Sequence, residues 1–193
     1  FIELILSELD FSKCQFEDSI QSLSSNKLQL TPTTINENHF CNIQKLFDVS
    51  FESDANSKNQ ITKVPDHLFY ACRIGTVSLS EEITTIGIAS FSLCEINEIK
   101  FQSISKLTAI GDYSFYGTTI FEELHLPDSI VHIGNYSFAH CCVPTSMFIP
   151  ANVESLKLPP NIESIGDSAF EGFGLSLPIY HYFYITLSNK FTS

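Results

Sequence analysis

The chain has 193 residues, of which 44% are hydrophobic and 17% are charged, and 17 of them are Phe. This composition is typical of a packed fold and excludes a disordered or coiled-coil chain. The 22 acidic residues outnumber the 10 basic ones, which gives a net charge of −12. Attraction to phosphate backbones or anionic lipid needs clustered Lys and Arg, so the charge balance argues against a nucleic-acid-binding or lipid-binding protein.

A membrane-spanning helix is not predicted, because no apolar run approaches the roughly 18 residues that such a helix needs. The longest candidate, residues 175–187, is interrupted by Pro178 and His181. The first nine residues are apolar but carry Glu3 and Glu8 and lack a basic start. They are therefore not interpreted as a signal peptide.

The first 60 residues show only faint periodicity. Phe11 and Cys14 have the F-x-x-C spacing that recurs later, and residues 28–30 and 47–49 look like short strands. We interpret residues 1–60 as degenerate N-terminal repeats or a cap, ending in a polar surface loop. A separate small domain is the alternative interpretation.

A sequence unit recurs between residues 61 and 178. Each unit has an apolar residue, then an Ile or Val three positions later, usually followed by Gly. A Phe follows five positions after that Ile or Val. The first four of these anchors lie 22, 24 and 23 residues apart, at Val64, Ile86, Ile110 and Ile133. The Phe residues are predicted to form the structural core of the repeats, and they are Phe69, Phe91, Phe115, Phe138 and Phe170.

Residues 124–141, LHLPDSIVHIGNYSFAHC, resemble the unit of BspA-like leucine-rich repeats, which reads roughly L-x-x-I-x-L-P-x-x-I-x-x-I-G-x-x-A-F-x-x-C. The resemblance covers about three-fifths of the chain. It implies an α/β repeat fold, a leucine-rich-repeat solenoid with one short strand and one short helix or turn per 22–24-residue repeat. The repeats are expected over residues 61–178.

Each position in the unit has a physical role. In the triplet Leu124-His125-Leu126, alternate residues face opposite sides, so the two Leu side chains point to the core and His125 points outward. Gly after the anchor is expected to allow a bend, and the Asp or Asn that follows lies where a helix N-cap would sit. These pairs are Gly111-Asp112, Gly134-Asn135 and Gly166-Asp167. The Phe residues are expected to stack as one internal column.

Three segments depart from the repeat pattern. Two extra residues are inserted around residues 103–106. Residues 144–160 imitate the first half of a repeat without completing it, so an irregular segment is expected there. Residues 179–193 form an aromatic C-terminal tail, which we expect to cover the open end of the core. A truncated repeat or a partner contact is the alternative for this tail.

Patterns of catalytic or metal-binding residues do not occur in the sequence. Four of the six Cys residues occupy the F-x-x-C slot, where a small thiol packs well, so reduced core cysteines are expected. There is no zinc spacing, H-E-x-x-H, G-x-S-x-G, G-x-G-x-x-G or G-K-[ST]. We therefore predict no enzyme, no cofactor and no metal site. The glycosylation sequon at Asn135 coincides with the expected cap position, which explains it without a glycan.

The remaining candidate site is the outward strand face of the solenoid, where repeat proteins commonly bind partners. Exposed aromatic and cationic side chains are typical of contact centres. The predicted partner-binding residues, none of them acidic, are Ser78, Lys100, His125, Phe148, Lys157 and Ser176, flanked by Glu98, Glu123 and Ser155. These residues predict a non-catalytic protein-binding module that does not bind nucleic acid.

The resemblance further implies a cell-surface or secreted protein of a bacterium or parasitic protist, which adheres to host matrix or to other cells. The alternative is an intracellular, cytoplasmic scaffold component of a larger assembly. Unpaired thiols and a sequon that is explained by packing fit this alternative. The sequence does not specify the partner.

Overall fold

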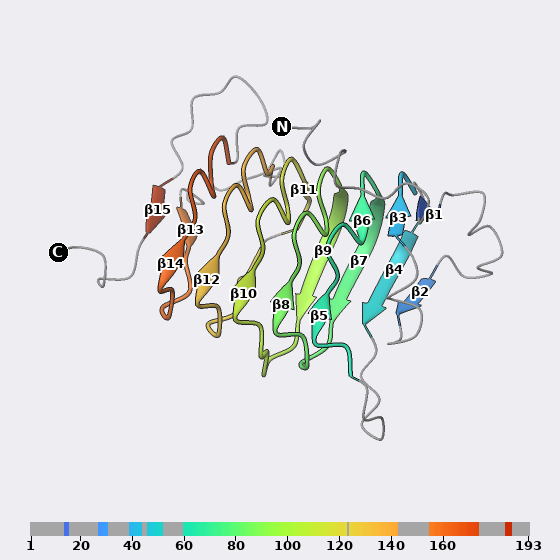
Figure 1. Cartoon of the computed structure of the whole chain (residues 1–193), viewed down its shortest axis with the longest axis horizontal. Helices are drawn as coiled ribbons and strands as arrows, with labels where there is room; N and C mark the ends of the chain where they lie inside the picture. Colours follow the sequence, from blue (N-terminus) through green and yellow to red (C-terminus); the bar gives the residue numbers. More distant parts are fainter. Residues whose placement is uncertain are drawn as a thin grey trace.

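The computed structural model describes residues 14–15, 27–30, 39–43, 46–51, 60–122, 124–142, 155–173 and 184–186. Within these ranges the regular structure consists of short strands that pair in parallel, and no helix occurs. Successive turns of the chain stack as rungs of a solenoid, with a row of arches along one edge (Figure 1). Each complete rung passes through a strand of one sheet, an arch and a strand of a second sheet.

The Ile and Val anchors lie in the first of these sheets, here called sheet C, whose order is β14-β12-β10-β8-β5. Equivalent residues pair across the rungs, so that Ile110 pairs with Ile86 on one side and with Ile133 on the other. The anchors point inward, and Val64 and Ile86 are fully buried. The strands are β5 (Lys63–Val64), β8 (Thr85–Ile86), β10 (Ala109–Ile110), β12 (His132–Ile133) and β14 (Ser164–Ile165).

The second sheet, sheet B, has the longer strands and the order β11-β9-β7-β4-β2. Its strands are β2 (Lys27–Leu30), β4 (Leu46–Phe51), β7 (Arg73–Leu79), β9 (Glu95–Phe101) and β11 (Thr119–Ile120). Two smaller sheets complete the described structure. The first, called sheet A, contains β1 (Cys14–Gln15), β3 (His39–Cys41) and β6 (Phe69–Tyr70). The second contains β13 (Ser155–Lys157) and β15 (Tyr184–Thr186).

The arches between sheets C and B are turns, so the short helix that the repeat pattern allowed is absent from the described arches. In an α-helix, backbone N–H groups bond to carbonyls four residues back. Here alternate donors point along the solenoid axis instead: Phe115 N donates to Ser137 O at 2.7 Å, and Gly117 N donates to Ala139 O at 2.9 Å. The donors between them bond three residues back within the arch, as Tyr116 N does to Tyr113 O at 3.1 Å. Stacking of the rungs thus uses about half of the hydrogen bonds that a helix would keep within one repeat.

Two positions in every arch adopt left-handed backbone geometry, with φ between 49° and 63°. The first lies three residues after the anchor and the second seven residues after it. The first set is His67, Ala89, Tyr113, Tyr136 and Ser168, and the second is Ala71, Leu93, Gly117, His140 and Gly172. Non-Gly residues in this geometry cost roughly 1–2 kcal/mol each, so stacking between rungs must hold the arches in place.

The Gly after the anchor has a different role from the bend that we expected. Its φ is not in the left-handed region, but a Cβ on Gly134 would lie 2.5 Å from Asp112 Oδ1 and 2.7 Å from the carbonyl carbon of Gly111. Gly is needed there because neighbouring rungs approach closely. The Asp and Asn residues cap no helix: Asp112 Oδ1 accepts the Asn135 N–H at 2.8 Å, and Asn135 Oδ1 accepts the Asp167 N–H at 2.7 Å.

The five predicted core Phe rings form one stack inside the solenoid. Phe115 lies between Phe91 and Phe138, with centroid distances of 5.3 and 5.1 Å and nearly parallel ring planes. Phe40 extends the column at its N-terminal end, 5.3 Å from Phe69. At the other end Phe170 is only half-buried. The complete column is Phe40, Phe69, Phe91, Phe115, Phe138 and Phe170.

Segments outside the regular repeats are described only in part. Strands β2 and β4 belong to sheet B, and Ser50 of β4 pairs in register with Ser78 of β7. The predicted insertion forms a loop after β9, in which Ile104 is 74% exposed. Of the expected irregular segment, residues 144–160, residues 144–154 lie outside the described residues. The aromatic tail lies outside them too, except for β15, which pairs with β13.

Candidate protein-interaction surface

The outer face of sheet B carries rows of polar side chains that run across the strands in exact register. One row consists of Ser50, Ser78 and Lys100, because these residues pair on β4, β7 and β9. The row beside it consists of Asp48, Thr76 and Glu98. All six side chains are at least partly exposed. The register follows from the parallel pairing of equivalent repeat positions.

The inward side of the same strands explains why these residues face outward. Val77 and Leu79 of β7 are 0% and 2% exposed, and they alternate with Thr76 and Ser78. Alternation breaks at Gly75, because Ile74 and Val77 both point inward with two residues between them. The pairing register also skips Gly75, on the side of β4 and on the side of β9. Before this position Arg73 pairs with Glu95, which pairs in turn with Thr119 on the next rung.

Arg73 and Lys100, the cations of β7 and β9, both form ion pairs. Lys100 Nζ lies 3.0 Å from Glu98 Oε2, and Arg73 Nε lies 2.8 Å from Glu95 Oε2. All four side chains are 40–60% exposed, and ion pairs at that exposure contribute only about 0–1 kcal/mol to stability. A partner could therefore exchange these pairs for its own at little cost. The acidic partners were missing from the six residues predicted from the sequence.

The structure brings together only part of the predicted site. Ser78 and Lys100 are neighbours on the face. His125 is exposed, as predicted. Residues 124–126 form no strand, so the prediction that they belong to the sheet is wrong. Phe148 and Ser176 lie outside the described residues. For Lys157 the backbone lies in β13 and is described, whereas the side chain is not.

The sequence argument did not include Asp48, Ser50 and Thr76 in the binding face. Thr76 lies two positions before the predicted Ser78 and shares its side of the strand, and Asp48 and Ser50 pair with Thr76 and Ser78 from β4. Phe121 also lies beside this sheet: its N–H donates to Ile96 O at 2.9 Å, and its side chain is 48% exposed. Strand periodicity could have found Asp48 and Thr76. Phe121 follows a two-residue strand that no pattern predicted.

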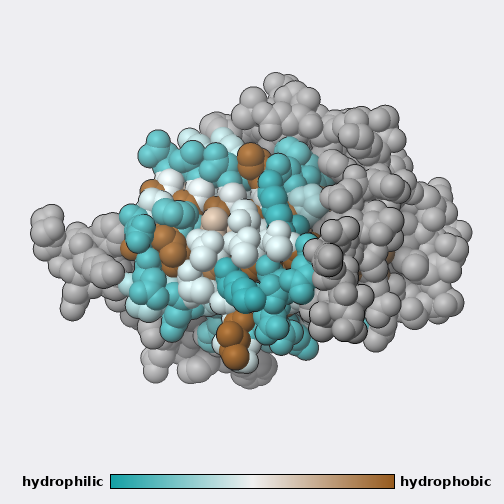
Figure 2. Space-filling model, turned by 60° about the horizontal axis from the view of Figure 1, so that its bottom comes forward, coloured by the Kyte–Doolittle hydropathy of each residue, from teal (hydrophilic) through white to brown (hydrophobic). Residues whose placement is uncertain are grey.

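Among the described residues, few large apolar side chains are exposed. The large ones among the described residues are Ile88, Ile104 and Phe121. Figure 2 shows that, on the face turned to the viewer, apolar atoms are scattered among hydrophilic and near-neutral ones. A large contiguous apolar area would indicate a hydrophobic interface. The visible described surface therefore favours polar recognition.

Three cysteines of the repeat slot, Cys72, Cys94 and Cys141, are described, and all three are buried and free. Burial raises the pKa of the Cys72 thiol to about 11 and raises those of Cys94 and Cys141 as well. A thiol is nucleophilic only as the thiolate, so these side chains are poor nucleophiles. No group of three or more His, Cys, Asp or Glu residues in the described part of the chain could hold a metal ion. A helix long and apolar enough to cross a membrane is likewise not found among the described residues.

The repeats match the description "BspA type Leucine rich repeat region" in six copies, over residues 9–143 and 62–177. The chain belongs to the BspA-type leucine-rich repeat family. This confirms the resemblance that residues 124–141 carry in the sequence. Comparison with curated proteins and with solved structures gave no match. Leucine-rich repeats are built from stacked units whose extended surfaces bind other proteins, so family membership indicates a protein-interaction module.

Proposed function

We propose that this BspA-type repeat protein is a non-catalytic adhesion module, which binds host matrix or cell-surface proteins through the outer face of sheet B. The observation that carries the proposal is the register of Ser50, Ser78 and Lys100 beside Asp48, Thr76 and Glu98. An in-register array of donors, acceptors and exchangeable ion pairs suits an extended polar interface. Surface or secreted location is the general setting of the family and supports this assignment.

A second candidate, an intracellular scaffold component, is favoured by the thiols and by the sequon. Ser137 is fully buried, and Asn135 Nδ2 donates to Asp112 Oδ2 at 3.3 Å. These contacts account for Asn135 and Ser137 as repeat positions without a glycan. Three buried free thiols also suit a reducing compartment. Mapping glycans at Asn135 and counting reactive thiols in protein from its native source distinguishes the two settings.

Binding measurements on purified extracellular-matrix and cell-surface proteins test the adhesion module. For any partner that binds the wild-type chain, the Ser78→Ala and Lys100→Ala double variant is expected to weaken affinity by about tenfold. The matched control is the Lys63→Ala and His132→Ala double variant on the outer side of sheet C, which removes one cation and one polar side chain as well. Equal affinity of the sheet B variant and the wild type would show that this face is not the binding site.

A further inference from the structure

The backbone hydrogen bonds between neighbouring arches have one direction. The N–H groups three, five and seven residues after an anchor donate to carbonyls of the following rung. In the rung of Ile133, Phe138 N donates to Ala169 O at 2.8 Å, and His140 N donates to Glu171 O at 2.6 Å. Each arch therefore presents a row of donors to the rung that follows it.

The equivalent donors of the last described arch have no acceptor among the described residues. This arch, residues 167–173, follows β14, which lies at the end of sheet C (Figure 1). Its donors, by their position in the repeat, are the N–H groups of Ser168, Phe170 and Gly172. Unpaired backbone groups on the edge of a sheet are a template for pairing with another chain.

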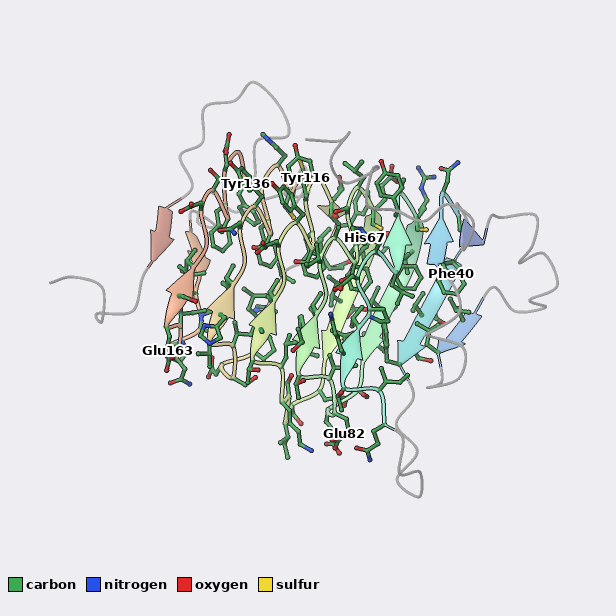
Figure 3. All side chains as sticks on the ribbon, viewed as in Figure 1. Phe40, His67, Glu82, Tyr116, Tyr136 and Glu163 are labelled. Atoms are coloured by element: carbon green, nitrogen blue, oxygen red, sulfur yellow. The ribbon has the colours of Figure 1, made fainter. Side chains whose placement is uncertain are left out.

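The edge strand β14 has unpaired acceptors beside these donors. In sheet C the Gly after each anchor donates to the anchor carbonyl of the preceding rung, as Gly166 N does to Ile133 O at 2.7 Å. The carbonyls of Glu163 and Ile165 lie in the corresponding positions of β14, and no N–H group in the described part of the chain bonds to them. Figure 3 shows Glu163 at the end of the array opposite Phe40.

The apolar residues at this end are less covered than their equivalents one rung earlier. Ile165 and Phe170 are partly exposed, whereas Ile133 is 2% and Phe138 is 0% exposed. Phe170 stacks on Phe138 at 5.4 Å with planes 3° apart. Phe173 lies 5.9 Å from Phe170 and 6.5 Å from Phe138, so it lies beside the two rings and not beyond the last one. Apolar surface and unpaired backbone groups thus share one register at this end.

The two ends of sheet C differ in residue type. In its first rung Pro65 takes the position of the Gly, and Pro has no N–H to donate to an earlier rung. In its last rung Asp167 takes the position of Asp112 and Asn135, whose side chains accept an N–H group of the following rung. The Asp167 carboxylate accepts no such bond from the described residues. Sheet C therefore starts with a residue that stops pairing and ends with residues that suit a further rung.

We propose that β14 and residues 167–173 bind an extended segment of a partner protein, which adds a parallel strand and an arch to the end of the array. The interfaces between the existing rungs define its chemistry: an Ile or Val beside Ile165, a Gly directly after it, and a Phe four residues after the Gly that stacks on Phe170. The Gly is required because rungs approach closely there, as shown by Gly166, on which a Cβ would lie 2.6 Å from Asn135 Oδ1.

Strand addition to an open sheet edge uses backbone hydrogen bonds for affinity and side-chain contacts for specificity. The end of the array supplies both, through the unpaired groups of β14 and through the Phe170 ring. It is separate from the outer face of sheet B, so the inference goes beyond the proposed function.

Titration of the intact chain with a synthetic peptide of residues 129–140, SIVHIGNYSFAH, tests the site, because this peptide has the required residues at the required spacing. It is expected to bind with one-to-one stoichiometry. Gly134→Pro in the peptide removes the N–H that bonds to Ile165 O and is expected to weaken binding by at least about tenfold. Phe138→Ser in the peptide removes the ring that stacks on Phe170 and is expected to have an effect of about the same size.

Variants of the intact chain locate the peptide at this end. Asp167→Ala is expected to weaken binding about three- to tenfold, which corresponds to one lost hydrogen bond. Asp167→Asn is expected to retain binding, because Asn135 accepts the same bond one rung earlier. Glu171→Ala is the matched control: it removes another exposed carboxylate of the same arch and is expected to weaken binding by less than about twofold.

The proposal is overturned if the peptide does not bind, if the Gly134→Pro peptide binds equally well, or if Asp167→Ala and Glu171→Ala have equal effects. Self-association of the intact chain that Asp167→Ala abolishes would assign this end to a second copy and would overturn the partner segment as well. Sedimentation velocity of the chain without peptide measures this. None of these outcomes bears on Ser78 and Lys100, whose variants test the sheet B face independently.

Discussion

Removing Phe115, an interior ring of the internal column, is expected to be costly. It is 1% exposed and stacks on Phe91 at 5.3 Å and on Phe138 at 5.1 Å. Truncating a buried Phe to Ala costs about 3–5 kcal/mol, because apolar burial is lost and a cavity remains. Two parallel ring contacts of about 0.5–1.5 kcal/mol each place Phe115→Ala toward the upper end of that range. This is a large share of the roughly 5–15 kcal/mol that stabilises an ordinary domain.

Phe170 provides the matched control at the end of the same column. It is half-buried, stacks on Phe138 alone at 5.4 Å and meets Phe173 edge-on at 5.9 Å. Phe170→Ala is therefore expected to cost about 2 kcal/mol, less than the usual value for a fully buried ring. Urea unfolding followed by circular dichroism measures both losses, and the slope m shows whether the whole array still unfolds as one unit. If the two variants lose the same free energy of unfolding, or if Phe115→Ala loses less, then burial and stacking in the ring column do not set the cost of removing a Phe.

Three further predictions test the arches. Gly134→Ala is expected to lower the free energy of unfolding by about 1–3 kcal/mol in the same urea assay, because its Cβ would lie 2.6 Å from the Asp112 backbone nitrogen. An unchanged midpoint of urea unfolding would contradict the close approach of the rungs. Ser137→Ala is expected to be neutral or stabilising by up to about 1 kcal/mol, because the buried hydroxyl has no hydrogen-bond partner in the structure and Ala169 fills the same position in the next rung. A clear loss of thermal stability would show that the Ser137 hydroxyl does form a hydrogen bond. Burial raises the pKa of Cys72 from 9.0 to about 11, so the folded chain keeps this proton at pH values where the unfolded chain loses it, and the free energy of unfolding falls as pH rises from 9 to 11. In urea titrations across this pH range, Cys72→Ala is expected to make the decrease in the free energy of unfolding smaller, and an equal decrease in variant and wild type would contradict this.

Several expectations from the sequence depended on local spacing and agree with the described structure. The anchors Val64, Ile86, Ile110 and Ile133 share one sheet because a period of 22–24 residues returns the chain to the same side of the solenoid. Ser78 and Lys100 are neighbours for the same reason. The family could be recognised from one unit, because its positions combine apolar burial, close backbone approach and turn geometry in a fixed order.

Other features could not be predicted because they depend on contacts between rungs. Asp112 and Asn135 have residue types that suit a helix N-cap, yet their side chains accept N–H groups of the next rung. Phe40 lies in a segment with faint periodicity and still joins the ring column, since its strand pairs with β6. Residues 124–126 have the pattern of a strand but form none. In that rung the strand of sheet B is β11, and only its two residues, Thr119 and Ile120, pair with β9.

The sequence by itself determined that this protein is a repeat with a Phe core, and it determined which family the repeat belongs to. Alternation and period are local properties, so residues such as Phe115 and Ile110 could be assigned to the core directly. The tertiary structure alone decided that the arches are turns and that the Asp and Asn residues form a ladder. It also decided that Arg73 lies beside Glu95 of the next rung. These features arise from hydrogen bonds and ion pairs along the stacking axis, between residues whose proximity only the folded chain creates.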